Sequence, residues 1–434
     1  MLRASLNSLS RNKFARNVAI VASGALGAQI ITMVFTPFVT RIYGPETFGL
    51  LGTFVAIVSV LAPCLSLSFP IAIALPEDDV EAKGLARLSF TLAFLMGAAL
   101  ALALWLGRQS FVELLNLQSI EAFIMFLPIA LFLSAWLEIE QQWLIRKKRF
   151  GEIAKVAVVQ AFLINSSKIG IGLFSATATV LISLTAVGSA MHAALLFKTA
   201  RINEPFFGLN PIKYSRNSFM SLAKKYSDFP IYRTPQIFIN AVSQSLPVIM
   251  LASFFGASTA GFYTLARLAM AMPSTLIGKS VGDVFYPRIN DAARSGENIT
   301  RLLIKASSIL AVVGFLPFTI IVIFGPWVFS QVFGSEWGVS GEYARYLSLF
   351  FYLNLINRPS VSAVPMLGLQ KGLLLYEIVS TGGKVIGLMI GFYIYKSDVM
   401  AIMLFSIIGA LTYLWMIAWI IYRSKGWKSE KASR

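Results

Sequence analysis

Long apolar runs alternate with short polar connections along the whole chain. A hydrocarbon layer about 30 Å thick needs about 20 residues of helix at 1.5 Å each, and the runs reach this length repeatedly. The alternation of period two that marks membrane strands is not visible. The pattern therefore predicts about twelve membrane-spanning helices, at residues 18–40, 48–75, 85–107, 120–144, 152–174, 178–199, 229–254, 260–286, 303–326, 341–368, 372–395 and 399–422.

These spans divide into two groups of six at the longest polar connection. The first apolar run is too long for the core of a signal peptide, so we interpret it as the first membrane helix. We expect an all-α polytopic membrane protein in which two six-helix lobes follow one another. The predicted domains are a cytoplasmic tail at 1–17, an N-terminal lobe at 18–199, a cytoplasmic linker at 200–228, a C-terminal lobe at 229–422 and a basic cytoplasmic tail at 423–434.

The composition agrees with a membrane protein, because 57% of the residues are hydrophobic and 13% are charged, against roughly 25% charged residues in soluble domains. A net charge of +17 could suggest nucleic-acid binding, but most Lys and Arg residues lie in short connections such as "RKKR" at 146–149. Placing both termini in the cytoplasm puts most of these charges on the inner side. We therefore expect a multi-pass membrane protein with both termini in the cytoplasm and no nucleic-acid partner.

Cofactor chemistry has no support in the sequence. Cys64 and His192 are each the single residue of their type, which predicts neither a disulfide framework nor a metal site. The phosphate-binding pattern GxxxxGK does not occur in the chain, and this argues against direct ATP hydrolysis. We expect no cofactor and no metal ion.

A weak internal repeat links the two predicted lobes. "RIYGPETFG" at 41–49 and "SFFGASTAG" at 253–261 align so that Gly44 matches Gly256. Each copy follows the first helix of a six-helix half, and glycine suits a tight turn between helices. An even number of spans gives both halves the same orientation, which predicts a parallel repeat with the substrate site between the halves near the middle of the membrane.

Three polar stretches resemble one family of exporters. They are "RIYGPETFGLLGTF" after the first span, "ALPEDDVEAKG" after the second, and "RKKRFGEIAK" between the fourth and fifth. Together with the pattern of spans they resemble the polysaccharide-biosynthesis exporters, the bacterial flippases for O-antigen and other lipid-linked oligosaccharides. These belong to the multidrug, oligosaccharidyl-lipid and polysaccharide exporter superfamily.

The resemblance implies a V-shaped arrangement of two six-helix lobes and alternating access. It implies transfer of an undecaprenyl-pyrophosphate-linked sugar unit from the cytoplasmic to the outer leaflet of the inner membrane. The implied partners are the lipid-linked oligosaccharide, the lipid bilayer, and the polymerase and glycosyltransferases of the same polysaccharide pathway.

Basic residues inside the predicted spans are the main candidates for a binding site. An arginine at the middle of a membrane costs about 2.5 to 3.5 kcal/mol on insertion scales, so it normally faces protein or a watery cavity. No equally deep carboxylate is visible, which predicts a net-positive cavity suited to the oxygens of a pyrophosphate. The candidates are Arg358 in "NLINRPSVSAVP", Lys384 in "TGGKVIG", Arg267 roughly 9 Å inside the eighth span, and Arg233 in "DFPIYRTPQ" at the start of the seventh.

Other polar residues of the spans could either join this site or only connect helices. Lys279 and Asp283 are four residues apart and can form a structural pair on one helix face, and Arg233 could instead extend to the membrane surface. We expect Glu138 and Glu140, with Gln141 and Gln142, to form a polar collar at the inner interface in preference to an acid/base pair. The secondary site candidates are Lys168, Lys279, Asp283, Asn240, Gln244, Asn354 and Asn357.

Two other function classes compete with a flippase. A cation-coupled multidrug exporter of the same superfamily would favour an Asp or Glu in the middle of a span, and none is evident. A membrane polysaccharide polymerase or ligase would need a sizeable outer loop with catalytic groups. One of the longest outer segments, 327–340, contains Glu336 as its single charge and is explained as a tryptophan-rich interfacial segment. We therefore expect a transporter that is not an enzyme.

Overall fold

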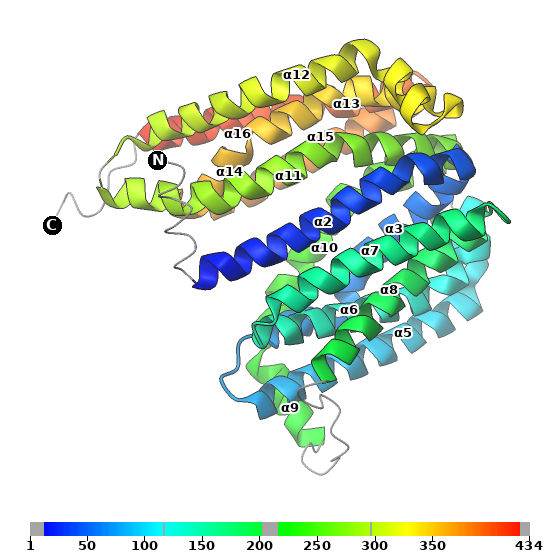
Figure 1. The fold of residues 1–434 in the computed structure, drawn as a ribbon, viewed down its shortest axis with the longest axis vertical. Helices are drawn as coiled ribbons and strands as arrows, with labels where there is room; N and C mark the ends of the chain where they lie inside the picture. Colours follow the sequence, from blue (N-terminus) through cyan, green and yellow to red (C-terminus); the bar gives the residue numbers. More distant parts are fainter. Residues whose placement is uncertain (1–12, 116–117, 202–215, 296, 426–434) are drawn as a thin grey trace. The chain divides into compact units, whose positions relative to one another are not determined.

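The computed structural model describes residues 13–115, 118–201, 216–295 and 297–425 (Figure 1). Within these residues the regular structure is helical, and no strand occurs. The chain forms two compact units, Met1–Ser253 and Phe254–Arg434. The helix that follows the linker, α10, thus groups with the first unit, because Ile249 packs on a buried cluster of that unit. The functional division into two lobes at the linker stays a prediction.

The first unit is built around two buried apolar clusters. Helix α2 packs along α7 (Figure 1), and the fully buried Tyr43 donates a hydrogen bond to the Lys168 carbonyl oxygen at 3.0 Å. The elements of this unit are α2 (Lys13–Ile42), α3 (Pro45–Ser66), α4 (Phe69–Ala72), α5 (Asp79–Leu115), η1 (Gln118–Phe126), α6 (Leu127–Arg146), α7 (Phe150–Gly172), α8 (Ala178–Arg201), α9 (Arg216–Lys225), the π-helical turn η3 (Phe229–Arg233) and α10 (Thr234–Phe255).

The second unit contains a close crossing of α12 and α13, where Gly325 and Gly341 let the two backbones touch. A third apolar cluster, which includes Phe285, Leu303 and Ile420, joins α11, α12 and α16. The elements of this unit are α11 (Ala257–Ser295), α12 (Ile299–Phe333), η4 (Ser335–Trp337), α13 (Gly338–Ile356), α14 (Arg358–Leu367), α15 (Gln370–Tyr393) and α16 (Asp398–Lys425).

All twelve predicted spans fall on helices. Among the described residues, nine helices are long and apolar enough to cross a membrane. The expected spans 152–174, 260–286 and 341–368, which are not among these nine, correspond to α7, α11 and the α13–α14 pair. The outer segment 327–340 differs from expectation, because α12 continues to Phe333 and the Trp337 side chain is only 1% exposed.

Two predicted spans are broken where the sequence contains proline. The span 48–75 is interrupted at Leu67 and Ser68, which have positive φ angles of 50° and 55°, and Pro70 lies in the first turn of α4 that follows. The span 341–368 is interrupted at Asn357, two residues before Pro359. Proline lacks an N–H and fits the first turn of a helix, so each proline starts a new helix instead of continuing the old one.

The two repeated glycine stretches both form the predicted turns between helices. Gly44 separates α2 from α3 with a φ of −70°, a value open to any residue. Gly256 separates α10 from α11 with a φ of +93°. Only the second turn therefore requires glycine.

Candidate functional site

A row of four aromatic rings crosses the second unit. Successive ring centroids are 6.3 Å apart from Tyr263 to Phe405, 5.4 Å from Phe405 to Phe350, and 5.2 Å from Phe350 to Tyr413. The rings come from α11, α13 and α16. We call these four residues the aromatic row. Three predicted site residues interact with its rings.

Each of three predicted site cations interacts with a ring of the aromatic row. The Lys384 ammonium is 5.9 Å from the centroid of Phe350, a distance at which the ring face attracts a cation. Arg267 interacts electrostatically with Tyr263, and Arg358 does so with Tyr413. All three cationic side chains are half-buried. The structure thus associates Arg267, Lys384 and Arg358 with rings of the aromatic row, while their role in a binding site stays a prediction.

The break between α13 and α14 contains two buried polar side-chain atoms that are unused. The Arg358 Nε is buried without a hydrogen-bond partner in the described part of the chain, as is the Oδ1 of Asn357. The Ser307 hydroxyl donates to the carbonyl oxygen of Ile356 at 3.2 Å and thereby satisfies one acceptor at the break. Since unsatisfied groups in hydrocarbon are costly, a broken helix at this depth normally lines protein or a cavity. A guanidinium N–H there is available to an incoming acceptor.

A carboxylate lies on the same helix as Lys384. Glu377 precedes Lys384 by two turns of α15 and interacts electrostatically with both Lys384 and Tyr413. Helical spacing of seven residues returns Glu377 to the face of Lys384, and the expectation that no carboxylate lies as deep as the cations stays a prediction. Three cations against one carboxylate still leave an excess of positive charge. Asn354 adds a polar contact through its Nδ2, which donates to the Tyr413 hydroxyl at 2.6 Å.

Sequence reasoning missed the aromatic row. Phe, Trp and Tyr make up 13% of the chain, so no single ring stands out in the sequence. The seven-residue spacing of Glu377 and Lys384 is a signal that could have placed the carboxylate. Among the described residues no group of three or more His, Cys, Asp or Glu could hold a metal ion.

Three further candidates lie in the first unit, on exposed positions of η3 and α10. The Arg233 Nη1 donates to the Gln236 Oε1 at 2.9 Å, and the Gln244 Nε2 donates to the Asn240 Oδ1 at 2.8 Å. The helical spacing of these residues places them along one side of α10. Lys168 is half-buried on α7. The side chains of Lys279 and Asp283 lie outside the described ones, so their pairing stays a prediction.

The predicted interfacial collar is wrong for one of its two carboxylates. Glu138 is half-buried, but Glu140 is fully buried in α6. Residues two apart on a helix point in different directions, and the Glu140 side chain points into the protein.

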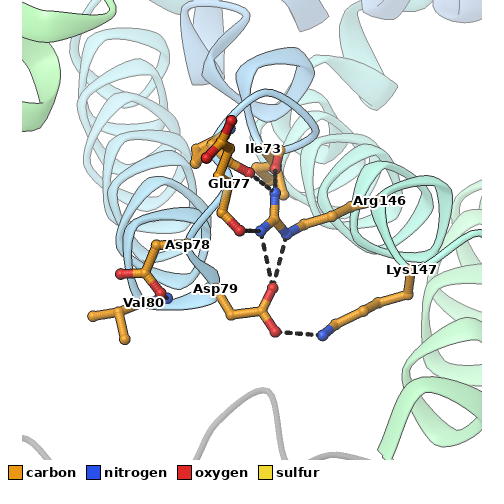
Figure 2. Close-up of polar contacts among 8 residues, drawn as sticks. Ile73, Glu77, Asp78, Asp79, Val80, Arg146 and Lys147 are labelled. Atoms are coloured by element: carbon orange, nitrogen blue, oxygen red, sulfur yellow. Dashed lines mark hydrogen bonds and ion pairs between the residues drawn. The ribbon is translucent and has the colours of Figure 1, made fainter.

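Two of the stretches that carry the family resemblance meet at the end of α6. Arg146 donates from Nε and Nη2 to the Asp79 Oδ1 at 3.1 and 2.9 Å, and Lys147 pairs with the other carboxylate oxygen at 2.5 Å (Figure 2). The Arg146 side chain is 9% exposed. Its guanidinium also reaches three backbone carbonyl oxygens of the α4–α5 connection, those of Ile73, Pro76 and Glu77. We call this arrangement the Arg146 clamp.

Known proteins with similar sequence and structure agree with this description. The family model described as "Polysaccharide biosynthesis protein" matches residues 38–342, which is more than half of the chain. The succinoglycan biosynthesis transport protein ExoT of Rhizobium meliloti (strain 1021) is 22% identical over 427 residues, covering 93% of this chain and 78% of that protein.

Solved structures share the fold at low identity. A multidrug resistance MATE family transporter of the MOP superfamily, in an inward-facing conformation, is 14% identical with a TM-score of 0.67, covering 94% of this chain and 96% of that one. A MOP superfamily transporter from Pyrococcus furiosus is 14% identical with a TM-score of 0.61, covering 96% and 97%. The all-α multi-pass fold and the resemblance noted in the sequence are thereby confirmed. The chain belongs to the polysaccharide biosynthesis protein family and has the fold of MOP-superfamily transporters.

Proposed function

We propose that this protein is a flippase for a lipid-linked oligosaccharide. It moves an undecaprenyl-pyrophosphate-linked repeat unit from the cytoplasmic to the outer leaflet of the inner membrane, and both of its termini are cytoplasmic. Membership of the polysaccharide biosynthesis family and the relation to a succinoglycan transport protein support a polysaccharide substrate. The observation that carries the proposal is the grouping of Arg267, Lys384 and Arg358 along the aromatic row, with the Arg358 Nε unused at a helix break.

The pyrophosphate is the part of the substrate that this site suits. Arg358 has a planar fork of donors that can hold two phosphate oxygens at once, and its buried Nε has no competing partner in the described structure. Lys384 supplies a point charge, and its ammonium lies 5.9 Å from the centroid of the Phe350 ring. In this proposal a pyrophosphate oxygen becomes the anionic partner of this ammonium.

The sugar headgroup needs neutral polar partners and apolar ring faces. Asn354 and Tyr413, already hydrogen bonded to each other, offer an amide and a hydroxyl beside the cations. The amides of Asn240 and Gln244 are hydrogen bonded to each other on exposed positions of α10 and stay secondary candidates. In this proposal the prenyl chain stays in lipid, and the protein alternates access around the headgroup. Substrate binding biases the two conformations only by its differential affinity for them.

A cation-coupled multidrug exporter is the alternative within the same superfamily. The excess of positive charge along the aromatic row repels a cationic drug, which favours the anionic substrate over this alternative. The proposal assigns no covalent chemistry to the site, so a polysaccharide polymerase or ligase activity is not part of it.

The test measures binding of undecaprenyl pyrophosphate to the purified protein in lipid nanodiscs. Each charge-assisted hydrogen bond contributes about 1.5 to 3 kcal/mol, so Arg358→Ala and Lys384→Ala are each expected to weaken binding by roughly tenfold or more. Arg358→Lys keeps the charge but loses the fork, and we expect an intermediate affinity. The control is Lys305→Ala, an exposed cation on α12 of the same unit. Unchanged affinity in both alanine variants would refute the pyrophosphate site.

The same variants should lose function in cells. A strain that depends on this protein is expected to lose surface polysaccharide with Arg358→Ala or Lys384→Ala, while the protein remains in the membrane. Normal polysaccharide in both strains would contradict the role of these cations in transport.

A further inference from the structure

A fully buried carboxyl group lies inside a membrane-spanning helix of the first unit. Glu140 on α6 is 0% exposed, and it is the single buried Asp, Glu, Lys or Arg in the part of the chain that the structure describes. It precedes the last residue of α6, Arg146, by six positions, or roughly 9 Å along the helix. Ionisable residues in such positions are rare and usually functional, so this carboxyl group requires a physical explanation.

The hydrogen bonds of Glu140 leave half of its carboxyl group unused. The Trp136 indole Nε1 donates to Oε1 at 3.1 Å, while Oε2 is buried without a partner within the described residues. A structural carboxylate would show more donors or a cation, because a buried ion needs compensation for its lost hydration. Glu140 has one neutral donor.

The charged groups of the neighbouring elements do not supply that compensation. α6 packs against α3, α4, α5, η1, α7 and α8. The described acidic and basic side chains of these elements and of α6 itself are neither hydrogen bonded nor ion paired with Glu140. They are Glu46, Asp79, Glu81, Lys83, Arg87, Arg108, Glu113, Glu121, Glu138, Arg146, Glu152, Lys155, Lys168, His192 and Lys198.

We propose that Glu140 is a proton-binding site, loaded in the conformation described here and unloaded in a second conformation where water reaches it. The neutral acid fits the observed surroundings, since it carries no charge and Trp136 still donates to its other oxygen. For unloading, the carboxyl O–H bond breaks, its electron pair stays on the oxygen, and the proton passes to a water molecule. The carboxylate that remains must be hydrated, so it cannot return to the packed position until it is protonated again.

This cycle couples a proton to the conformational change of the transporter. Protonation stabilises the packed conformation around Glu140, and loss of the proton stabilises the hydrated one. For a single proton the ratio of the two conformations changes by about tenfold per pH unit in the range where the site titrates. The inference goes beyond the proposed function, because it supplies a source of energy for net transport whatever the substrate of the second unit is.

The protonation state can be measured without any substrate. Infrared difference spectroscopy separates the carbonyl stretch of a protonated carboxyl from the bands of a carboxylate. We expect the protein in nanodiscs at neutral pH to show a protonated-carboxyl band that Glu140→Gln removes and Glu138→Gln retains. The Gln variant has nearly the same shape as the neutral acid, and it is expected to fold. Glu140→Asp, which keeps a carboxyl group, should retain a shifted band. A band that survives in Glu140→Gln overturns the proposal.

Coupling requires a second measurement, made in proteoliposomes with an imposed pH gradient. We expect the flipping rate of a fluorescent polyprenyl-pyrophosphate probe to respond to the gradient in the wild-type protein and in Glu138→Gln, but not in Glu140→Gln. Equal responses in all three proteins would overturn the coupling, even if the infrared band is lost. Binding of undecaprenyl pyrophosphate is expected to stay unchanged in Glu140→Gln, so a failure of this inference is distinguishable from a failure of the pyrophosphate site.

Discussion

Replacement of Arg146 by alanine is the most direct test of the packing described for the first unit. Its side chain is 9% exposed and bonds to Asp79 and to three backbone carbonyl oxygens (Figure 2). Loss of one partner of a buried pair costs about 3 to 5 kcal/mol. Asp79 is 44% exposed and keeps Lys147 as a partner, so water and Lys147 offset part of the loss. We therefore expect Arg146→Ala to lower the free energy of unfolding by about 3 kcal/mol.

The neighbouring Lys147 provides the matched control. It pairs with the same carboxylate and lies over the Trp143 ring, whereas the bonds to the three carbonyl oxygens that define the clamp come from Arg146. The loss of such a partly exposed pair costs at most about 1 kcal/mol. Arg146→Ala should therefore destabilise the protein clearly more than Lys147→Ala. Arg146→Lys should fall between them, because a single ammonium cannot satisfy the carboxylate and three separate carbonyl oxygens.

The assay heats the purified protein in detergent and follows the fraction that remains monodisperse by size-exclusion chromatography. At about 2 to 4 °C per kcal/mol for a unit of this size, Arg146→Ala should lower the midpoint by roughly 6 to 12 °C and Lys147→Ala by a few degrees at most. Unfolding of membrane proteins is often irreversible, so the variants are compared at one heating rate. Equal midpoints for the two alanine variants would show that the buried carbonyl contacts do not stabilise the unit.

Two further predictions concern the second unit. Gly325→Ala places a Cβ at 2.6 Å from the Gly341 carbonyl oxygen and should destabilise the protein by about 1 to 3 kcal/mol through overpacking. The control is Gly382→Ala, whose new Cβ has nothing within 4 Å and which should be neutral or slightly stabilising. Similar thermal midpoints for the two variants would contradict the close crossing of α12 and α13. Asn298→Ala removes the side-chain acceptor for the Arg301 N–H at 2.9 Å and should cost about 1 kcal/mol of stability, while Asn298→Asp should retain the cap, and thermal midpoints of the two variants measure the difference.

The sequence predicts the helices well because span length is a local property. Every expected span falls on a helix, and both glycine stretches form turns. Proline positions were visible in the sequence, but which proline would break a span was not. Pro247 and Pro317 lie inside continuous helices, whereas Pro70 and Pro359 begin new ones. The difference depends on whether neighbouring helices satisfy the freed backbone groups, which is a property of packing.

The charged residues of the candidate site could be predicted from the sequence, but the residues that surround them could not. Arg358 and Lys384 stand out because a cation inside an apolar run is unusual. Their contacts with Tyr413 and Phe350 join elements far apart in the chain, and a run of abundant aromatic residues gives no hint of such pairs. The burial of Glu140 was missed for a related reason, since a residue near the end of a span can face either the interface or the protein.

The break between α13 and α14 has a consequence for how this protein tolerates change. Side-chain donors such as Arg358 can be removed by one substitution, but Pro359 has no N–H to give to the preceding turn, and this is so whatever side chains surround it. Part of the polarity at this position thus comes from the main chain and not from the side chains. A library of substitutions across α13 and α14 should therefore abolish transport most readily where it restores a continuous helix, as Pro359→Ala does, and retune substrate choice where it alters side chains alone.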